Sequence, residues 1–154
     1  MAGGTIRHNI IINEINYILK DLINGKKCIL LTENVKLEIK KDNFYVYPDI
    51  MVTCDKSDFE DNNNTIIKNP VIIIEVLSPS TEIYDRNTKK NKYLKLPSLK
   101  YYLIVAQDNV HIEMYEKIQS KIFFTVYDKQ DKTIDFKQLD FKMPVSDIYS
   151  KIEF

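Results

Sequence analysis

The first hydrophobic pattern in the chain has the period of a helix. Over residues 5–24 apolar side chains recur every three or four positions, at Ile11, Ile15, Ile18, Leu19 and Leu22. This spacing gathers apolar side chains on one face of an α-helix. Asn24-Gly25 follows, and glycine commonly ends helices. The pattern predicts an amphipathic helix that stops at Gly25.

From Cys28 onward the hydrophobic period shortens to about two. Four short runs follow, at 28–31, 35–39, 44–47 and 50–53, and the polar turn Lys40-Lys41-Asp42-Asn43 separates the second from the third. Alternation of this kind is typical of half-buried strands. We expect antiparallel strands here, followed by an acidic, asparagine-rich loop over residues 55–64.

A nearly continuous apolar run over residues 71–77 has the composition of a strand buried on both faces. The turn Ser78-Pro79-Ser80-Thr81 follows it. Asp85 is then expected to cap a helix from Arg86 to about Leu96, which Pro97 ends. Three more strands are predicted at 101–106, 110–117 and 121–127.

This order of elements predicts an α/β (α+β) fold in which helices flank a central mixed sheet. Side chains alternate between the two faces of a strand. Asp49 therefore shares a face with Met51, and Glu75 shares a face with Ile73 and Leu77. The pattern leaves open whether these two faces coincide.

Composition and charge narrow the class of protein. The chain has 154 residues, of which 44% are hydrophobic, and this suits one domain with one sizeable core. Its 22 basic and 22 acidic side chains give no net charge, so any attraction to nucleic acid must be local. No apolar run is long enough to cross a bilayer, so no membrane partner is expected.

Two cysteines bear on the compartment. Cys28 and Cys54 form no CxxC motif and no Cys/His cluster, which argues against a zinc site and against a disulfide framework. The sequence therefore predicts reduced core cysteines in a cytoplasmic protein.

Two acids are the first candidates for chemistry. Glu75 is the one charged residue in its apolar strand, and Asp49 stands just before the strand at 50–53. A buried charge is costly unless it is paired or ligates a cation. Two acids on neighbouring strands could hold a hard divalent ion, which would compensate for their burial.

A basic stretch is the second candidate. Residues 86–100 contain no acid and include Arg86, Lys89, Lys90, Lys92, Lys95 and Lys100. Lys89 and Tyr93 stand four positions apart, so they share a helical face that could point over the sheet edge. A solvated helix face and a phosphate-binding surface are both open for this stretch.

Several short motifs resemble the Uma-type restriction-endonuclease family, formerly a domain of unknown function, within the PD-(D/E)xK nuclease superfamily. The resemblance covers nearly the whole chain, and the run from Glu75 to Thr81 is highly specific. The matching residues are Arg7-His8-Asn9, Tyr47-Pro48-Asp49, Asn69-Pro70 through Glu82, Tyr84-Asp85-Arg86, Lys89, Tyr93, Pro97-Ser98-Leu99 and Tyr102.

The resemblance implies a restriction-endonuclease-like core in a single domain over residues 1–154, without a short N-terminal family segment that relatives carry. In the superfamily an Asp and a Glu bind Mg²⁺, and a Lys helps to activate the attacking water. Carried over, Asp49 and Glu75 are the ligands of Mg²⁺, for which Mn²⁺ would substitute. Leu77 stands where the superfamily motif has its lysine, and Lys89 on the following helix takes that role.

The function implied is that of a metal-dependent endonuclease that hydrolyses phosphodiester bonds in DNA. Arg86, Lys90 and Lys92 are expected to contact phosphates. His8, Asp85 and Tyr93 are expected to support the site. Glu14, in the first helix, is either a further metal contact or an exposed surface residue.

Two other classes of function remain open. The domain could be a catalytically inactive module that binds nucleic acid or a protein partner through its basic helix. It could also be a homodimer, in which tyrosines near strand ends form the interface. The tyrosines considered are Tyr101, Tyr102, Tyr115 and Tyr127.

Overall fold

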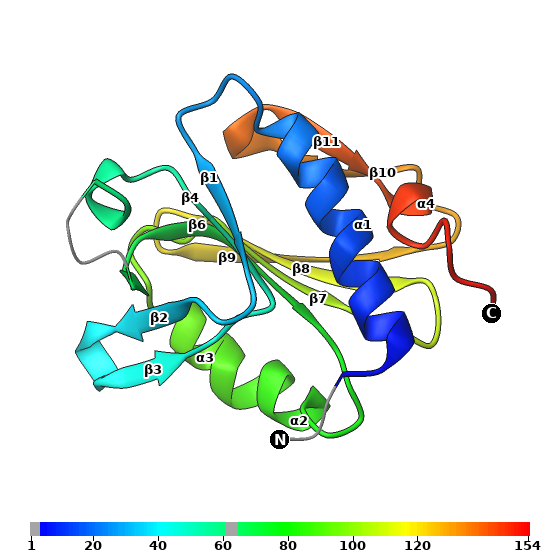
Figure 1. The fold of residues 1–154 in the computed structure, drawn as a ribbon, viewed down its shortest axis with the longest axis horizontal. Helices are drawn as coiled ribbons and strands as arrows, with labels where there is room; N and C mark the ends of the chain where they lie inside the picture. The colour runs from blue at the N-terminus through cyan, green and yellow to red at the C-terminus, as the bar shows by residue number, and fades with distance from the viewer. Residues whose placement is uncertain (1–3, 61–64) are drawn as a thin grey trace.

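A six-stranded mixed sheet forms the centre of the molecule (Figure 1). The computed structural model describes residues 4–60 and 65–154. Only the neighbours β6 and β7 run parallel, and the other four pairs of this sheet are antiparallel. In spatial order the strands are β1 (Ile29–Thr32), β4 (Ile50–Thr53), β6 (Pro70–Val76), β7 (Tyr101–Val105), β8 (His111–Ile118) and β9 (Lys121–Asp128).

Helix α1 (Ile6–Leu22) covers one face of this sheet. Thr5 caps it, because its Oγ1 accepts a hydrogen bond from the backbone N–H of His8 at 3.1 Å. The predicted stop is confirmed, since Gly25 takes the left-handed conformation with φ of 79°. The buried face of α1 comprises Ile11, Ile12, Ile15 and Leu19.

The C-terminal segment extends the same layer, although the sequence pattern predicted none of its elements. Strands β10 (Thr133–Phe136) and β11 (Phe141–Pro144) form a two-stranded antiparallel sheet, joined by the short 3₁₀ helix η4 (Lys137–Leu139). Helix α4 (Val145–Ile148) follows and lies beside α1 (Figure 1). Ile134, Phe136 and Met143 are fully buried, so this segment completes the core on the α1 side.

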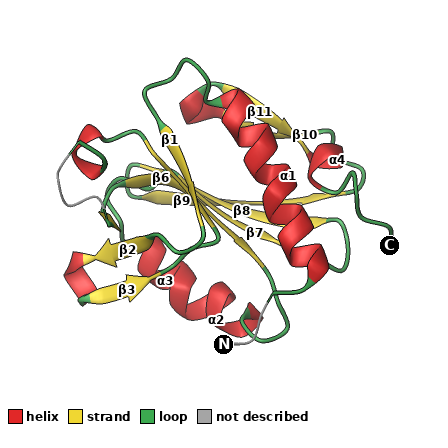
Figure 2. Cartoon of the chain, in the orientation of Figure 1, coloured by secondary structure: helices red, strands yellow, loops and turns green. Residues whose placement is uncertain are grey.

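A helical segment covers the opposite face (Figure 2). It runs through α2 (Glu82–Tyr84), the π-helical turn η3 (Asp85–Lys89) and α3 (Lys90–Tyr93). The predicted cap is wrong, because Asp85 lies inside this segment rather than at its start. Its backbone N–H donates to the carbonyl of Thr81 at 2.8 Å, so the chain is already helical one turn earlier.

The predicted antiparallel strands divide between two sheets. β1 and β4 join the central sheet, whereas β2 (Lys36–Ile39), β3 (Phe44–Val46) and the short β5 (Ile66–Ile67) form a separate three-stranded sheet. The 3₁₀ helix η1 (Lys40–Asp42) occupies the predicted turn between β2 and β3. Leu37 and Ile39 of this small sheet belong to a second hydrophobic core, on the α2–α3 side of the central sheet, which also contains Tyr93.

The predicted acidic loop begins with the 3₁₀ helix η2 (Lys56–Asp58), and its residues 61–64 lie outside the described residues. Asp58 is buried, and its carboxylate accepts hydrogen bonds from Thr53 Oγ1 at 2.7 Å and from the N–H of Lys68 at 2.9 Å. One carboxylate therefore ties the two ends of this connection together.

The prediction of two reduced cysteines is wrong. Cys28 and Cys54 are joined by a disulfide, with their Cα atoms 4.0 Å apart. The pairing of Ile29 with Thr53 between β1 and β4 explains this, because continuing that register by one residue sets the two cysteines opposite each other. Local sequence patterns do not reveal a pairing between residues 26 positions apart.

Across the described ranges 4–60 and 65–154, no helix has both the length and the apolar character that a bilayer crossing requires.

Candidate active site

Asp49 and Glu75 meet at one end of the central sheet. The register of β4 against β6 pairs Met51 with Ile73, and both side chains belong to the core beneath Tyr93. By alternation Asp49 and Glu75 lie on that same face, so the two faces that the sequence left unrelated coincide. The backbone N–H of Asp49 donates to Glu75 Oε2 at 3.4 Å, and the N–H of Val76 donates to Asp49 Oδ2 at 2.8 Å.

Glu75 is buried but not isolated. Its residue is 1% exposed, and Oε1 accepts hydrogen bonds from Lys89 Nζ at 3.0 Å and from the Tyr93 hydroxyl at 2.7 Å. Lys89 Nζ also lies 2.9 Å from Asp85 Oδ1. The π-helical turn and the helix after it thus aim two side chains, four residues apart, at one carboxylate oxygen.

The buried charges do not balance. Two carboxyl groups, from Glu75 and Asp85, contact the ammonium of Lys89, and the charge of Asp49 acts on Glu75 from the other side of the pair. Burial is the main cause that raises the pKa of Glu75 to about 8, and the ammonium of Lys89 only partly offsets it. Burial lowers the pKa of Lys89, but Glu75 and Asp85 outweigh it, so that pKa is raised and the ammonium keeps its proton. Such a surplus of acids favours a bound cation.

His8 and Glu33 complete the acidic end of the site. His8 Nε2 lies 3.3 Å from Asp49 Oδ2, and the hydrogen bond to Asp49 is the main cause that raises the pKa of His8. The backbone N–H of Glu33 donates to the carbonyl of Asp49 at 3.1 Å. Ligand atoms of His8, Glu33 and Asp49 all lie within 4.8 Å of one another.

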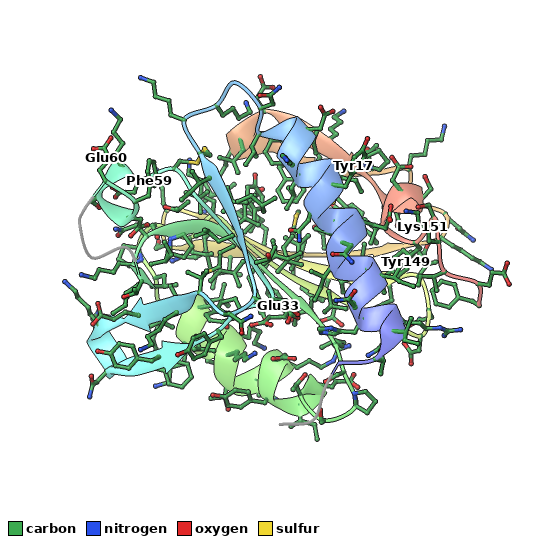
Figure 3. The ribbon with its side chains drawn as sticks, in the orientation of Figure 1. Tyr17, Glu33, Phe59, Glu60, Tyr149 and Lys151 are labelled. Carbon is green, nitrogen blue, oxygen red and sulfur yellow. A yellow bond between two sulfur atoms is a disulfide. The ribbon has the colours of Figure 1, made fainter. Side chains whose placement is uncertain are left out.

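Glu33 was not among the residues predicted from sequence. The one clue to Glu33 is the antiparallel pairing of β1 with β4, which sets Thr32 opposite Ile50. Glu33 follows Thr32 and Asp49 precedes Ile50, so these two residues meet. Figure 3 shows Glu33 near the middle of the molecule, between α1 and the segment α2–α3.

Glu14 lies apart from these residues. Its Oε1 is 2.8 Å from Lys151 Nζ, and its Oε2 accepts a hydrogen bond from Ser150 at 3.4 Å. Figure 3 shows Lys151 beside α4, away from Glu33. The structure therefore brings Asp49, Glu75, Lys89, His8, Asp85 and Tyr93 together and leaves Glu14 out.

The basic stretch is largely neutralised by acids from other elements. Arg86 pairs with Glu82 at 3.0 Å and also with Glu113. Lys92 Nζ lies 3.1 Å from Asp42, at the end of η1. Lys90 Nζ lies 5.4 Å from the centroid of the Tyr115 ring, and none of the described residues places a carboxylate within 4.0 Å of it. Of the three predicted phosphate contacts, Lys90 is thus the one without an acidic partner in the described chain.

Tyrosines hold the helix that carries Lys89. The hydroxyl of Tyr102 donates to the carbonyl of Asp85 at 3.0 Å, and the rings of Tyr93 and Tyr102 meet edge to face at 5.1 Å. Tyr101 and Tyr102 are both 0% exposed, so they cannot form the predicted dimer interface on the folded molecule.

A cavity of about 420 Å³ opens between the start of α1, the turn after β6 and the loop after β7. Arg7, next to His8, and Leu77, two residues beyond Glu75, both line it. Arg86, Gln107 and His111 also line it, together with apolar surface. The cavity is thus connected to the site through the chain neighbours of His8 and Glu75, although the acids of the site do not themselves line it.

The fold places the protein in a structural class. A protein from Anabaena variabilis, described as a putative nuclease belonging to DUF820, superposes with a TM-score of 0.74 at 18% sequence identity. The superposition covers 97% of this chain and 83% of that chain. The mixed sheet flanked by helices is therefore a nuclease fold, as the sequence predicted.

Sequence comparison gives the family. The chain belongs to the Uma2 family, described as "Putative restriction endonuclease", which it matches over residues 1–144. It is 30% identical over 154 residues to the uncharacterized protein slr1290 of Synechocystis sp., a match that covers 100% of this chain and 80% of that one. The uncharacterized protein sll1609 of the same organism is 31% identical over 118 residues, covering 77% of this chain and 67% of that one. The family predicted from the motifs is confirmed.

Proposed function

We propose that the protein is a metal-dependent endonuclease that hydrolyses phosphodiester bonds in DNA, with Asp49, Glu75 and Lys89 as its catalytic residues. One observation carries this proposal. Two carboxylates from neighbouring strands and one buried ammonium converge at a sheet end, in a chain of a restriction-endonuclease family. The cytoplasm stays the proposed location, but the cysteines no longer support it, because Cys28 and Cys54 form a disulfide.

The residues at this sheet end fit a hard divalent ion such as Mg²⁺, with Mn²⁺ as a substitute. Asp49 and Glu75 offer carboxylate oxygens, which both ions prefer. Glu75 Oε1 accepts from Lys89 and Tyr93 at 3.0 and 2.7 Å, whereas Oε2, on the Asp49 side, accepts one long hydrogen bond of 3.4 Å and is the oxygen better placed to ligate. When bound, such an ion neutralises charge on the scissile phosphate and acidifies the attacking water.

Lys89 supplies the fixed positive charge. Glu75 and Asp85 hold its ammonium from two sides, at 3.0 and 2.9 Å, so its position is set before substrate arrives. An ammonium placed this way can orient the attacking water and stabilise the charge that develops on the phosphoryl oxygens. Tyr93 and Asp85 act as positioning residues, because each reaches the reacting groups only through Glu75 or Lys89.

Binding of the DNA backbone falls first to Lys90 and then to Arg86 and Lys92. Lys90 has no carboxylate partner among the described residues, whereas Arg86 and Lys92 would have to exchange theirs for phosphates. Contacts of this kind position the strand without reading its sequence. We expect Lys90→Ala to weaken binding of all DNA sequences alike and to reduce the salt dependence of binding.

Cleavage of supercoiled plasmid tests the proposal. Purified protein is incubated with Mg²⁺ or Mn²⁺, with EDTA controls, and compared with Asp49→Asn, Glu75→Gln and Lys89→Met. We expect nicking that needs the metal, and a loss of at least about 100-fold in each variant. Lys56→Met is the matched control, because Lys56 is an exposed lysine on η2 paired with Glu60. Cleavage that survives in all three variants would refute these residue assignments.

A non-catalytic binding module is the second candidate, and one observation favours it. Lys89, the proposed catalytic cation, is already held by Glu75 and Asp85, whereas Lys90 has no carboxylate partner among the described residues and could bind a phosphate without any chemistry. A module of this kind would bind DNA equally well in EDTA and would tolerate Asp49→Asn. Wild-type protein that binds DNA without metal and cuts neither single-stranded nor double-stranded DNA would establish it.

A further inference from the structure

A mixed group of metal-binding side chains gathers around Asp49. It consists of the imidazole of His8 from the first turn of α1, the carboxylate of Glu33 from the loop after β1, and Asp49 itself. Glu75 does not belong to this group, in which every ligand atom lies within 4.8 Å of every other. Asp49 is the one residue common to this group and to the acid pair with Glu75.

The spacing of these atoms fits a single ion. Ligands at about 2.1–2.3 Å from an ion lie about 3.0–3.3 Å apart when adjacent and up to about 4.6 Å apart when opposite. His8 Nε2 and Asp49 Oδ2 are 3.3 Å apart, and Glu33 joins them within 4.8 Å. One ion can therefore reach all three side chains with only small side-chain movements.

The backbone already holds two of these side chains in place. The N–H of His8 donates to the Thr5 cap, and the His8 side chain is 12% exposed. A Cβ placed on Gly4 would lie 3.0 Å from His8 Nδ1, so Gly4 packs against that edge of the ring while Nε2 faces Asp49. Glu33 is tied to Asp49 through its own backbone N–H at 3.1 Å.

Glu33 has no competing cation nearby. In the described part of the chain no lysine or arginine lies within 4.0 Å of its carboxylate, whereas Glu38 pairs with Lys68, and Glu113 with Arg86. Glu33 is exposed, so an ion can reach its carboxylate from solvent. Glu33 thus adds an exposed acid to the partly buried pair of His8 and Asp49, and a metal ion bound by all three would replace the proton between His8 Nε2 and Asp49.

We infer that His8, Glu33 and Asp49 form a second cation site that takes a first-row transition ion such as Mn²⁺ in preference to Mg²⁺. An imidazole nitrogen favours such ions, whereas Mg²⁺ prefers oxygen ligands and retains its water. The inference rests on the proposed function in one respect, since Asp49 is shared with the proposed catalytic pair. It deepens that function, because the proposed nuclease then has two metal sites: the acid pair, which prefers Mg²⁺, and the site with His8, which prefers Mn²⁺.

Mn²⁺ binding tests the second site without any nuclease assay. Free Mn²⁺ is counted by electron paramagnetic resonance during a titration of the purified full chain, in the presence and absence of excess Mg²⁺. We expect the wild type to bind two Mn²⁺ ions and to retain one of them in excess Mg²⁺. His8→Gln and Glu33→Gln should each weaken the binding of that Mg²⁺-resistant ion about tenfold or more, because even the loss of a residue that only supports a metal ligand has an effect of this size.

Matched variants separate a lost ligand from a disturbed fold. His8→Gln keeps a side chain that can hydrogen-bond Asp49 but removes the imidazole, and Glu33→Gln keeps the backbone bond to Asp49. His111→Gln is the control, because His111 pairs with Glu113 outside the group. Glu75→Gln should lose the other ion and keep the Mg²⁺-resistant one, which distinguishes the second site from the proposed catalytic pair.

The possible outcomes are distinct. Loss of the Mg²⁺-resistant ion in His8→Gln and Glu33→Gln, with retention in Glu75→Gln and His111→Gln, supports the second site even if no DNA is cut. A wild type that retains no Mn²⁺ in excess Mg²⁺, or unchanged Mn²⁺ affinity in both His8→Gln and Glu33→Gln, would overturn it. Nuclease activity that persists in that case would leave the proposed function standing on Asp49, Glu75 and Lys89.

Discussion

At the scale of single residues, Glu75 shows a conflict between folding and metal binding. Its carboxyl is buried with Asp85 and Lys89, and the charge of the partly exposed Asp49 also acts on it. The folded state therefore holds the Glu75 proton more tightly than the unfolded chain does, with a pKa of about 8 against an ordinary value of 4.5. A group whose pKa is raised on folding favours the folded state less as pH rises between those two values.

The stability of the metal-free protein should therefore fall between about pH 4.5 and pH 8 through this group. Glu75→Gln removes that part of the slope, and we expect it to raise the free energy of unfolding at pH 8 by up to about 4 kcal/mol, since the pKa rises from 4.5 to about 8 on folding and one pKa unit corresponds to about 1.4 kcal/mol. Urea unfolding at several pH values in EDTA measures it. The difference between variant and wild type cancels the contributions of His8 and other groups.

The same variant should respond differently to metal. Mg²⁺ is expected to stabilise the wild type, because it binds the folded state alone, and to stabilise Glu75→Gln much less. Equal stabilisation of both proteins would show that Glu75 is not a ligand.

Tyr93 tests how the carboxylate is oriented. Its hydroxyl donates to Glu75 Oε1 at 2.7 Å, and both groups are buried. Tyr93→Phe should lower the free energy of unfolding by about 1 kcal/mol, because a buried hydrogen bond is lost. It should also weaken Mg²⁺ binding about 10- to 100-fold, the usual effect of removing a residue that hydrogen-bonds a metal ligand. Tyr102→Phe is the matched control, because its hydroxyl binds the carbonyl of Asp85 instead. Equal Mg²⁺ affinity in both variants would contradict an orienting role.

At the scale of elements, local periodicity predicted those parts of the fold that depend on neighbouring residues. Helix α1 and strands β6 to β9 follow the patterns that the sequence displays, and the apolar side chains of α1, β6, β7 and β8 pack in the two cores. The division of the first four strands between two sheets depends on which distant strand each one meets. The joining of Cys28 to Cys54 and the approach of Glu33 to Asp49 have the same origin.

The candidate site divides in the same way. Asp49 and Glu75 were predictable because each breaks an apolar pattern, and Lys89 because it shares a helical face with Tyr93. Asp85 was misplaced, since an acid near the start of a basic helix resembles a cap and the π-helical turn that buries it has no local pattern. The neutralisation of Arg86 and Lys92 was hidden for another reason, because their acidic partners come from α2, β8 and η1.

The disulfide between β1 and β4 gives a prediction about elements. It closes a segment of 26 residues that also carries Glu33 and Asp49. Reduction should lower the free energy of unfolding by about 3 kcal/mol, the chain-entropy value for a loop of this length. Denaturant unfolding with and without dithiothreitol measures the loss, and the double variant Cys28→Ser/Cys54→Ser should show no response to the reductant. Identical unfolding of reduced and oxidised wild type would show that the bond adds nothing to stability.

At the scale of the whole molecule, β9 is the exposed edge of the central sheet. It is the last strand in the sheet order, and four of its large apolar side chains are 44–55% exposed: Ile122, Phe123, Phe124 and Val126. A long apolar edge strand offers unpaired backbone groups to another strand. We expect a homodimer, which the sequence left open with tyrosines as its interface, to use this edge instead, with a second copy of β9 continuing the sheet.

Replacing one apolar residue of this edge by a charge tests that arrangement. Sedimentation velocity over a range of concentrations should show the wild type as a dimer and Phe124→Lys as a monomer, because an edge lysine opposes strand pairing. Tyr45→Lys is the matched control, since Tyr45 is also exposed, at 47%, but lies on β3 in the small sheet. Metal binding and cleavage should be unchanged in Phe124→Lys, because β9 and β4 lie at separate places in the sheet order. A wild type that stays monomeric at every concentration would exclude the dimer, and a dimer that persists in Phe124→Lys would place its interface on another surface.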